Sequence, residues 1–201
     1  MKFVAATQNL GKFSEIAAIL SNTVEVISLT VPVCTDEDGH TFLENAVKKA
    51  RAVVMATGLP AIADDSGLEV DALDGAPGVY SARFAGEGAS DAERIAKLLG
   101  LMHGIPDPQR TARFRCVVAI VFPTGRVITA EGICEGCIAH QPRGENGFGY
   151  DPVFVVPELG GRTFAELDPE VKNRISHRAR ALETLKKEVA SSLLFSLPPC
   201  R

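Results

Sequence analysis

The sequence predicts an α/β protein built on a mixed sheet, and three observations support that class. Apolar runs of strand length alternate with segments whose apolar residues recur at helical spacing. Two strand-like segments, 112–122 and 127–139, flank the turn Pro-Thr-Gly-Arg and predict an antiparallel hairpin. Polar segments directly follow predicted strands, where open α/β sheets bind their ligands. We therefore expect helices on a sheet that is not purely parallel.

The elements alternate regularly in the first part of the chain. Residues 2–7 predict a strand, 12–21 a helix and 24–29 a second strand. A polar loop leads into a helix over 42–57. The short apolar run 60–64 predicts a buried strand that ends at the sequence Asp-Asp-Ser-Gly.

The later elements carry clear capping signals. A loop-rich stretch, 67–86, precedes a helix for which Ser90 is the expected cap. After the hairpin, residues 145–156 predict a loop and then a strand. The last helix is expected to start at Asp168 as cap and Pro169 as first helical residue.

Composition excludes several classes of protein. The chain has 201 residues with 46% hydrophobic content, enough for one substantial core or for one domain with two lobes. The net charge of −4 disfavours broad nucleic-acid binding. The short apolar start does not resemble a signal peptide, and no run approaches the roughly 18 residues of a membrane span. We expect a cytoplasmic protein without a membrane or nucleic-acid partner.

The five cysteines do not predict a disulfide framework, because their number is odd and their spacing irregular. Cys134 and Cys137 form a C-x-x-C pair, but the chain has no second pair to complete a zinc site. In a strand, positions three apart point to opposite faces. We interpret the pair as two incidental strand cysteines.

The segment Thr-Gln-Asn-Leu-Gly-Lys, residues 7–12, has the composition of an anion site. The backbone N–H groups at a helix start bind anions readily, and Lys12 adds a positive charge where an acidic residue is usual. Thr7 or Asn9 could cap the helix, and Gly11 would let a ligand approach the backbone. The pattern supports equally well a capped helix with a solvated lysine.

Two adjacent carboxylates, Asp64 and Asp65, end the apolar run 60–64. Adjacent strand side chains point opposite ways, so one carboxylate should face a ligand while the other supports a neighbouring loop. Such a carboxylate could hold Mg²⁺ or orient and deprotonate a water, and Ser66 could contact a phosphate. A plain turn at the end of a strand is an equally good interpretation.

Further acids precede the helix over 42–57. Glu37, Asp38 and Glu44 are candidate ligands, because Mg²⁺ takes a few carboxylates together with water and phosphate oxygens. For each of them a structural role is the simpler interpretation. Asp38 or Thr41 may cap the helix, with Glu44 as its first-turn acid.

Two later segments suggest recognition of a flat, anionic ligand. Phe148 or Tyr150, in a glycine-rich turn, could stack on a base, and the glycines would let base edges reach the backbone. Lys172, His177 and Arg178 lie close in sequence but diverge around a helix. Alternatively, Ser176 caps a new helix that directs His177 and Arg178 toward the ligand.

The order of these motifs resembles the inosine triphosphate pyrophosphatase family, the XTP/dITP diphosphatases. The segments concerned are TQNLGK, TFLENA, ADDSG, GAPGVYSARFAG, GFGYDP and ISHR, and the resemblance runs from about Lys2 to Val189. It implies a single domain over 1–189 with two lobes, followed by 190–201 as a candidate disordered tail. It implies an α/β fold with an elongated, twisted mixed sheet flanked by helices, two lobes and a central cleft. It also implies a homodimer, and Mg²⁺-dependent hydrolysis of ITP, dITP and XTP to the monophosphate and pyrophosphate, which cleanses the nucleotide pool.

The resemblance also assigns residues by position. Asp65 would be general base and metal ligand, with Glu37 or Glu44 as a second metal carboxylate, and Lys12 would be catalytic. The phosphate loop would comprise Thr7, Gln8, Asn9, Leu10, Gly11 and Lys12. Further substrate contacts would be Ser66, Phe148, Gly149, Tyr150, Asp151, Lys172, His177 and Arg178.

Two other functions stay open. A nucleotide-binding sensor would have the same site but would leave ITP intact in Mg²⁺, and the set of carboxylates argues against it. A pyrophosphatase for modified pyrimidine nucleotides, of the septum-inhibitor type, would share the chemistry. The sequence Ile-Ser-His-Arg favours the purine substrate.

Overall fold

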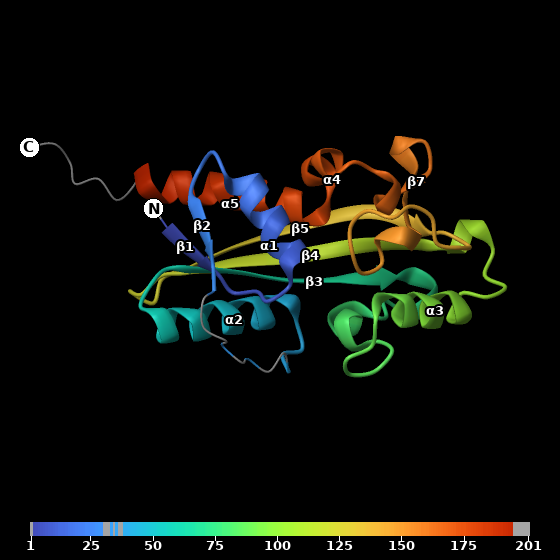
Figure 1. The fold of residues 1–201 in the computed structure, drawn as a ribbon, viewed down its shortest axis with the longest axis horizontal. Helices are drawn as coiled ribbons and strands as arrows, with labels where there is room; N and C mark the ends of the chain where they lie inside the picture. The colour runs from blue at the N-terminus through green and yellow to red at the C-terminus, as the bar shows by residue number, and fades with distance from the viewer. Residues whose placement is uncertain (1, 30–32, 34, 36–37, 195–201) are drawn as a thin grey trace, which may run out of the picture. The chain divides into compact units, whose positions relative to one another are not determined.

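The structure, a computed structural model, describes residues 2–29, 33, 35 and 38–194, with only the backbone given for 190–194. Within this part of the chain one sheet has seven strands in the order β2-β1-β3-β4-β5-β6-β7 (Figure 1). The strands are β1 (Lys2–Ala5), β2 (Glu25–Ser28), β3 (Ala61–Val70), β4 (Thr111–Val121), β5 (Val127–Ile138), β6 (Phe154–Val156) and β7 (Arg162–Thr163).

The sheet is mixed, as the sequence predicts. Strand β1 pairs in parallel with β2 and β3, whereas β5 and β6, and β6 and β7, pair antiparallel. Backbone bonds from Phe122 N to Arg126 O and from Ile138 N to Arg110 O join opposite ends of β4 and β5. These bonds confirm the antiparallel hairpin.

Five α-helices lie in the described residues: α1 (Leu10–Leu20), α2 (Phe42–Thr57), α3 (Asp91–Leu101), α4 (Pro169–Ile175) and α5 (His177–Leu194). Short 3-10 turns connect them: η1 (Asp71–Leu73), η2 (Gly78–Arg83), η3 (Asp107–Gln109), η4 (Asp151–Val153), η5 (Pro157–Leu159) and η6 (Phe164–Glu166). None of the described helices is both long enough and apolar enough to cross a bilayer.

Helix α2 has the predicted bounds because both of its ends carry strong local signals. The Thr41 hydroxyl accepts from Glu44 N at 3.1 Å, and Gly58 ends the helix with a φ of 69°. Helix α3 begins at its predicted cap, Ser90, where the reciprocal bonds with Glu93 form a capping box.

Two predicted boundaries are wrong. Strand β3 does not end at the paired carboxylates but continues to Val70, because Asp64 and Asp65 find partners on neighbouring elements and the following Leu68 is buried. The last helix is not continuous. Ser176, with φ −65° and ψ 161°, is extended and separates α4 from α5, which is the alternative left open from the sequence.

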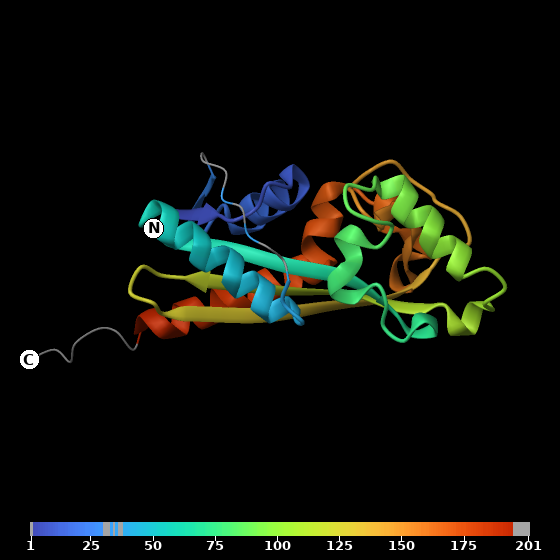
Figure 2. The same cartoon turned by 90° about the horizontal axis from the view of Figure 1, so that it is seen from below.

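The chain forms two compact units. Unit 1 comprises Met1–Asp65, Val117–Gly132 and Arg178–Arg201, and unit 2 comprises Ser66–Cys116 and Ile133–His177. In unit 1, α2 covers one face of the sheet and α1 and α5 cover the other (Figures 1 and 2). One part of its core consists of small apolar side chains, among them Ala50, Ala61 and Ala63.

The core of unit 2 is aromatic. Phe114, Phe154 and Phe164 pack with ring centroids 4.6 to 5.8 Å apart. Leu98 of α3 and Met102, which directly follows that helix, belong to the same cluster. Such rings stabilise a core through the large area that they bury and through their mutual packing.

Arg110 joins three segments of unit 2 through backbone carbonyls. It is 3% exposed. Its guanidinium donates to Ile138 O at 2.7 Å, Met102 O at 2.9 Å and Ala139 O at 2.9 Å. A planar guanidinium has five N–H donors and can satisfy several orphan carbonyls at once. The end of α3 and the end of β5 are therefore fixed to the start of β4.

We predict that Arg110→Met lowers the free energy of unfolding by roughly 2–4 kcal/mol, because it leaves several buried carbonyls without donors. Urea unfolding measures the loss. Arg51→Met, on the exposed side of α2, is the matched control and should change the stability by less than about 0.5 kcal/mol. Equal stability of the two variants would contradict a structural role for Arg110.

Candidate functional site

The N-terminus of α1 is capped and carries a cation. Asn9 Oδ1 accepts from Lys12 N at 3.0 Å, and Thr7 Oγ1 accepts from Asn9 N at 3.1 Å. The side chain of Lys12 is only 18% exposed, and its ammonium lies 3.3 Å from Asp64 Oδ2. The structure confirms Asn9 as the helix cap. It contradicts the alternative of a solvated lysine, because the Lys12 ammonium is paired with Asp64.

The other residues of this loop are more open to solvent. Gln8 is exposed, Leu10 is 82% exposed, and Gly11 is half-buried. An exposed leucine at the first position of a helix contributes little to the core. The free N–H groups of this first turn remain suited to an anion.

Asp64 is the centre of a buried ion cluster in unit 1. Arg178 Nη2 donates to Asp64 Oδ2 at 2.7 Å and Nε does so at 3.2 Å. Arg178 also pairs with Glu15 of α1. Burial by itself would raise the pKa of Asp64, but the charges of Arg178, Lys12 and Lys49 outweigh it and hold the pKa well below its usual range.

Asp65 points to the other face of β3. Its Oδ2 accepts from Asn45 Nδ2 at 3.0 Å, and its Oδ1 accepts from Lys49 Nζ at 3.1 Å. Both donors lie on α2, whereas the partners of Asp64 lie on α1 and α5. The expectation that the two carboxylates face opposite ways is therefore confirmed.

Sequence reasoning did not identify three residues of these clusters: Glu15, Asn45 and Lys49. Each is a buried polar side chain on a helix that also buries apolar residues. On α2, Asn45 and Lys49 are four residues apart and so share a face. A polar residue within an otherwise apolar helical stripe was the available signal.

The predicted acids just before α2 and in its first turn have structural partners where they are described. Glu44 Oε2 accepts from His40 N at 2.8 Å, so Glu44 acts as the first-turn acid. Asp38 pairs with Lys48 near the surface. Glu37 lies outside the described residues. In the part of the chain described, no three His, Cys, Asp or Glu side chains form a group that could hold a metal by themselves.

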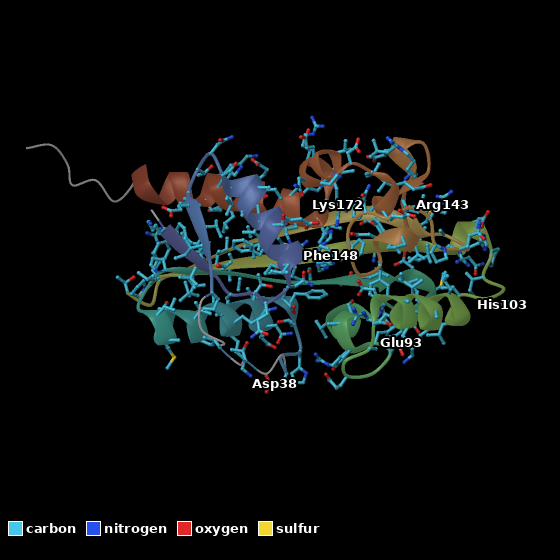
Figure 3. The ribbon with its side chains drawn as sticks, viewed as in Figure 1. Asp38, Glu93, His103, Arg143, Phe148 and Lys172 are labelled. Carbon is cyan, nitrogen blue, oxygen red and sulfur yellow. The ribbon has the colours of Figure 1, made fainter. Side chains whose placement is uncertain are left out.

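A second group of predicted residues meets in unit 2. Asp151 and Lys172 are both buried and form an ion pair. The Lys172 ammonium lies 4.6 Å from the ring centroid of Phe148, on the ring face. Figure 3 labels both residues in the same part of the molecule. Asp151 Oδ2 also accepts from Phe148 N at 2.9 Å. Gly147 permits this approach, because a Cβ there would lie 2.1 Å from Asp151 Oδ2.

The next two residues of this loop are attached elsewhere in unit 2. Gly149 N donates to Asp91 Oδ2 at 2.7 Å, and Tyr150 OH donates to Ser81 O at 2.9 Å. Burial raises the pKa of Tyr150, which keeps this hydroxyl a donor. The N–H groups of Phe148 and Gly149 thus both donate hydrogen bonds to carboxylates. The sequence had suggested that the edges of a base would reach this backbone.

His177 and Arg178 begin α5 but belong to different units. The His177 ring stacks on Phe114 at a centroid distance of 4.6 Å in unit 2. The Arg178 guanidinium is held by Asp64 and Glu15 in unit 1, with the Lys12 group and not with Phe148. Ser66 is half-buried and is the first residue of unit 2. Ser176 is fully buried ahead of α5.

Comparison with known proteins gives consistent matches over nearly the whole chain. The model of the Ham1 family matches residues 3–188. A protein of Desulforamulus reducens called dITP/XTP pyrophosphatase is 58% identical over 187 residues, which is 91% of this chain and 92% of that protein. A protein of Geobacillus kaustophilus with the same name is 54% identical over 93% of each chain.

A solved structure supports the fold directly. The structure of a HAM1 protein from Coxiella burnetii superimposes with a TM-score of 0.84 at 47% sequence identity. The alignment covers 95% of this chain and 99% of that chain. The α/β architecture expected from the sequence is confirmed by this likeness and by the mixed sheet.

The buried Asp64 cluster predicts a specific dependence of stability on pH. Because the folded-state pKa of Asp64 lies below its unfolded value of about 3.9, its stabilisation is complete above that value and is lost as the pH falls below it. Asp64→Asn should lower the free energy of unfolding by roughly 2–4 kcal/mol between pH 5 and 8. At pH 3.5 the unfolding free energies of the variant and the wild type should lie closer together.

Urea unfolding at pH 7, 5 and 3.5 measures this difference. Asp38→Asn removes a carboxylate from an ion pair near the surface and should change little at any of the three pH values. The lowered pKa of Asp64 would be contradicted if the loss of unfolding free energy in Asp64→Asn were unchanged at pH 3.5 or already reduced at pH 6.

Proposed function

We propose that this chain, which belongs to the Ham1 family, hydrolyses non-standard purine nucleoside triphosphates, ITP, dITP and XTP, to the monophosphate and pyrophosphate. Family membership confirms the resemblance inferred from the motifs. The substrate class follows from the dITP/XTP pyrophosphatases that are 58% and 54% identical to this chain. The chain is thus a hydrolase of nucleotide metabolism.

The observation that carries the proposal is the group at the start of α1. Lys12 lies against a carboxylate that also accepts two hydrogen bonds from Arg178, so Asp64 keeps a cationic partner when the ammonium turns to a phosphate. The first-turn N–H groups of α1 add donors for the same anion. Thr7 to Lys12 would therefore bind the phosphate tail, with Gln8, Asn9, Leu10 and Gly11 supplying backbone.

Asp65 is the proposed general base. Lys49 and Asn45 occupy one lone pair on each carboxylate oxygen, which leaves acceptor capacity on both and fixes the side chain in one orientation. A carboxylate held in this way can orient a water and take its proton as the phosphorus–oxygen bond breaks. Phosphoryl transfer requires mainly such positioning and charge stabilisation.

A divalent metal fits this donor set. Mg²⁺ typically takes one or two carboxylates and completes its shell with water and substrate phosphates, so three protein ligands are not required. Asp65 would hold it, with Glu44 or Glu37 as a second carboxylate. When bound, Mg²⁺ would neutralise charge on the phosphates.

The purine would be recognised by the group in unit 2. Lys172 covers one face of the Phe148 ring, so a base would stack on the opposite face. Gly149, Tyr150 and Asp151 would fix this ring, with Ser66, His177 and Arg178 as further contacts. Hypoxanthine and xanthine present a 6-keto acceptor where adenine presents a donor, and donors aimed there would reject adenine by about 10⁴ or more.

The homodimeric state and the cytoplasmic location form part of the same proposal. Both come from the family resemblance and from the use of the nucleotide pool in the cytoplasm. Light scattering coupled to size-exclusion chromatography measures the oligomeric state of the full chain. A mass of about 21 kDa in place of twice that value would remove the dimer from the proposal.

The reaction is tested by a panel of nucleoside triphosphates with Mg²⁺, assayed for pyrophosphate against orthophosphate. We expect pyrophosphate from ITP, dITP and XTP, with ATP turned over far more slowly. Bound but intact ITP would instead identify a sensor. Release of orthophosphate, or preference for a modified pyrimidine nucleotide, would also contradict the proposal.

Asp65→Asn should lower kcat for ITP by about 10²–10⁴, the usual contribution of a general base. Its fold should survive, because an amide still accepts from one of the two donors on α2. Pyrophosphate release measures kcat, and urea unfolding checks the fold. Near-normal turnover would remove the assigned role.

Lys12→Ala should lower kcat/KM by about 10-fold to 100-fold, because a charge-assisted contact to phosphate contributes about 1.5–3 kcal/mol. Lys2→Ala is the matched control, since Lys2 pairs with Glu25 at the surface and should leave the kinetics unchanged. Equal kinetics of the two variants would show that Lys12 does not bind the phosphates.

A further inference from the structure

We propose that Asp91, the first residue of α3, is a positioning residue that holds the loop carrying Phe148 in the orientation needed to stack on the purine. This inference rests on the proposed function. It concerns a residue outside the motifs by which the chain resembles its family. All of the contacts that support it lie within unit 2.

The Asp91 carboxylate joins α3 to the loop. Its Oδ2 accepts the Gly149 N–H at 2.7 Å, and its Oδ1 is paired with Arg94 one helical turn later. Arg94 is itself fixed, because it donates to Ala82 O and Ala89 O at 2.7 Å each. The carboxylate is therefore held in place from one side while it binds the loop from the other.

The loop is attached at three successive residues, and each attachment has a different origin. Phe148 N bonds to Asp151 inside the loop, Gly149 N bonds to Asp91 on α3, and Tyr150 OH bonds to Ser81 O in η2. The side chains of Asp151 and Tyr150, which make the other two attachments, both follow Gly149 in the chain. Of these three partners, Asp91 is the one that lies on an α-helix, whereas Asp151 begins η4 and Ser81 lies in η2.

The geometry of Gly149 explains why this attachment matters for Phe148. Gly149 has a φ of 63°, which is a left-handed conformation. A glycine without a restraining contact adopts this conformation as only one of many. The hydrogen bond from its N–H fixes the peptide plane that links it to Phe148. Without Asp91, this plane can rotate, and the ring then samples orientations in which a base cannot stack.

Asp91 also contributes to the start of α3 as an acidic first-turn residue, so a control must separate the two effects. Ser90 provides it. Ser90 caps the same helix through its capping box, in which its hydroxyl bonds with Glu93. Ser90→Ala weakens the helix start and leaves the Asp91–Gly149 bond in place.

The experiment measures KM and kcat for ITP, and inhibition by inorganic tripolyphosphate, in the full chain and its variants. Asp91→Ala should raise KM for ITP by about 3- to 10-fold, the factor to which one net hydrogen bond corresponds, with kcat within about twofold. Inhibition by tripolyphosphate, which lacks a base, should not change. Asp91→Asn keeps an acceptor for Gly149 and should stay within about twofold of wild type.

An unchanged KM in Asp91→Ala would overturn the proposal. A KM in Ser90→Ala as high as in Asp91→Ala would overturn it too, because the effect would then come from the helix start. Equal loss in Asp91→Asn, or weaker tripolyphosphate inhibition, would have the same consequence. A wild-type chain that does not hydrolyse ITP would refute the proposed function instead, and amide hydrogen exchange at Gly149 would still test the contact, with faster exchange expected in Asp91→Ala.

Discussion

A buried carboxylate in the middle of a sheet is stable only when cations compensate it, and Asp64 imposes this constraint on unit 1. Arg178 supplies the main compensation, although it lies 114 residues away in sequence. The same guanidinium pairs with Glu15, so one ion cluster joins β3, α1 and α5. Desolvating these groups is costly, and the pairing of opposite charges within the cluster offsets that cost. The start of α1, with Lys12, is placed by this cluster.

The two adjacent aspartates have different tasks because a strand sends them to opposite faces. Asp64 faces α1 and α5 and is occupied by cations, whereas Asp65 faces α2 and is held by one cation and one amide. One carboxylate therefore fixes the scaffold around the anion site. The other keeps acceptor capacity for chemistry, which is the division of roles that the proposed function requires.

Local signals predicted those elements whose ends are set by neighbouring residues. Thr41 and Gly58 set the ends of α2, and Ser90, the cap expected from the sequence, sets the start of α3. The length of β3 could not be predicted, because two aspartates in a strand are tolerated only when Arg178, Lys12, Lys49 and Asn45 satisfy them.

The candidate site followed from the sequence only in part, for the same reason. Motif order brought forward Lys12, Asp65, Phe148 and Lys172, but it did not indicate which residues hold them. Asn45, Lys49 and Asp91 act through contacts with residues 16 to 58 positions away. Such pairs leave no local pattern beyond a polar residue on a buried helical face.

A crystal structure of the protein with Mg²⁺ and a non-hydrolysable analogue of ITP tests the central claim most directly. We predict that Lys12 Nζ turns from Asp64 Oδ2, now 3.3 Å away, to a phosphate oxygen, while Arg178 stays on Asp64. We also predict that Asp65 contacts the same triphosphate. A structure in which Lys12 still binds Asp64 and the triphosphate contacts neither Lys12 nor Asp65 would contradict it.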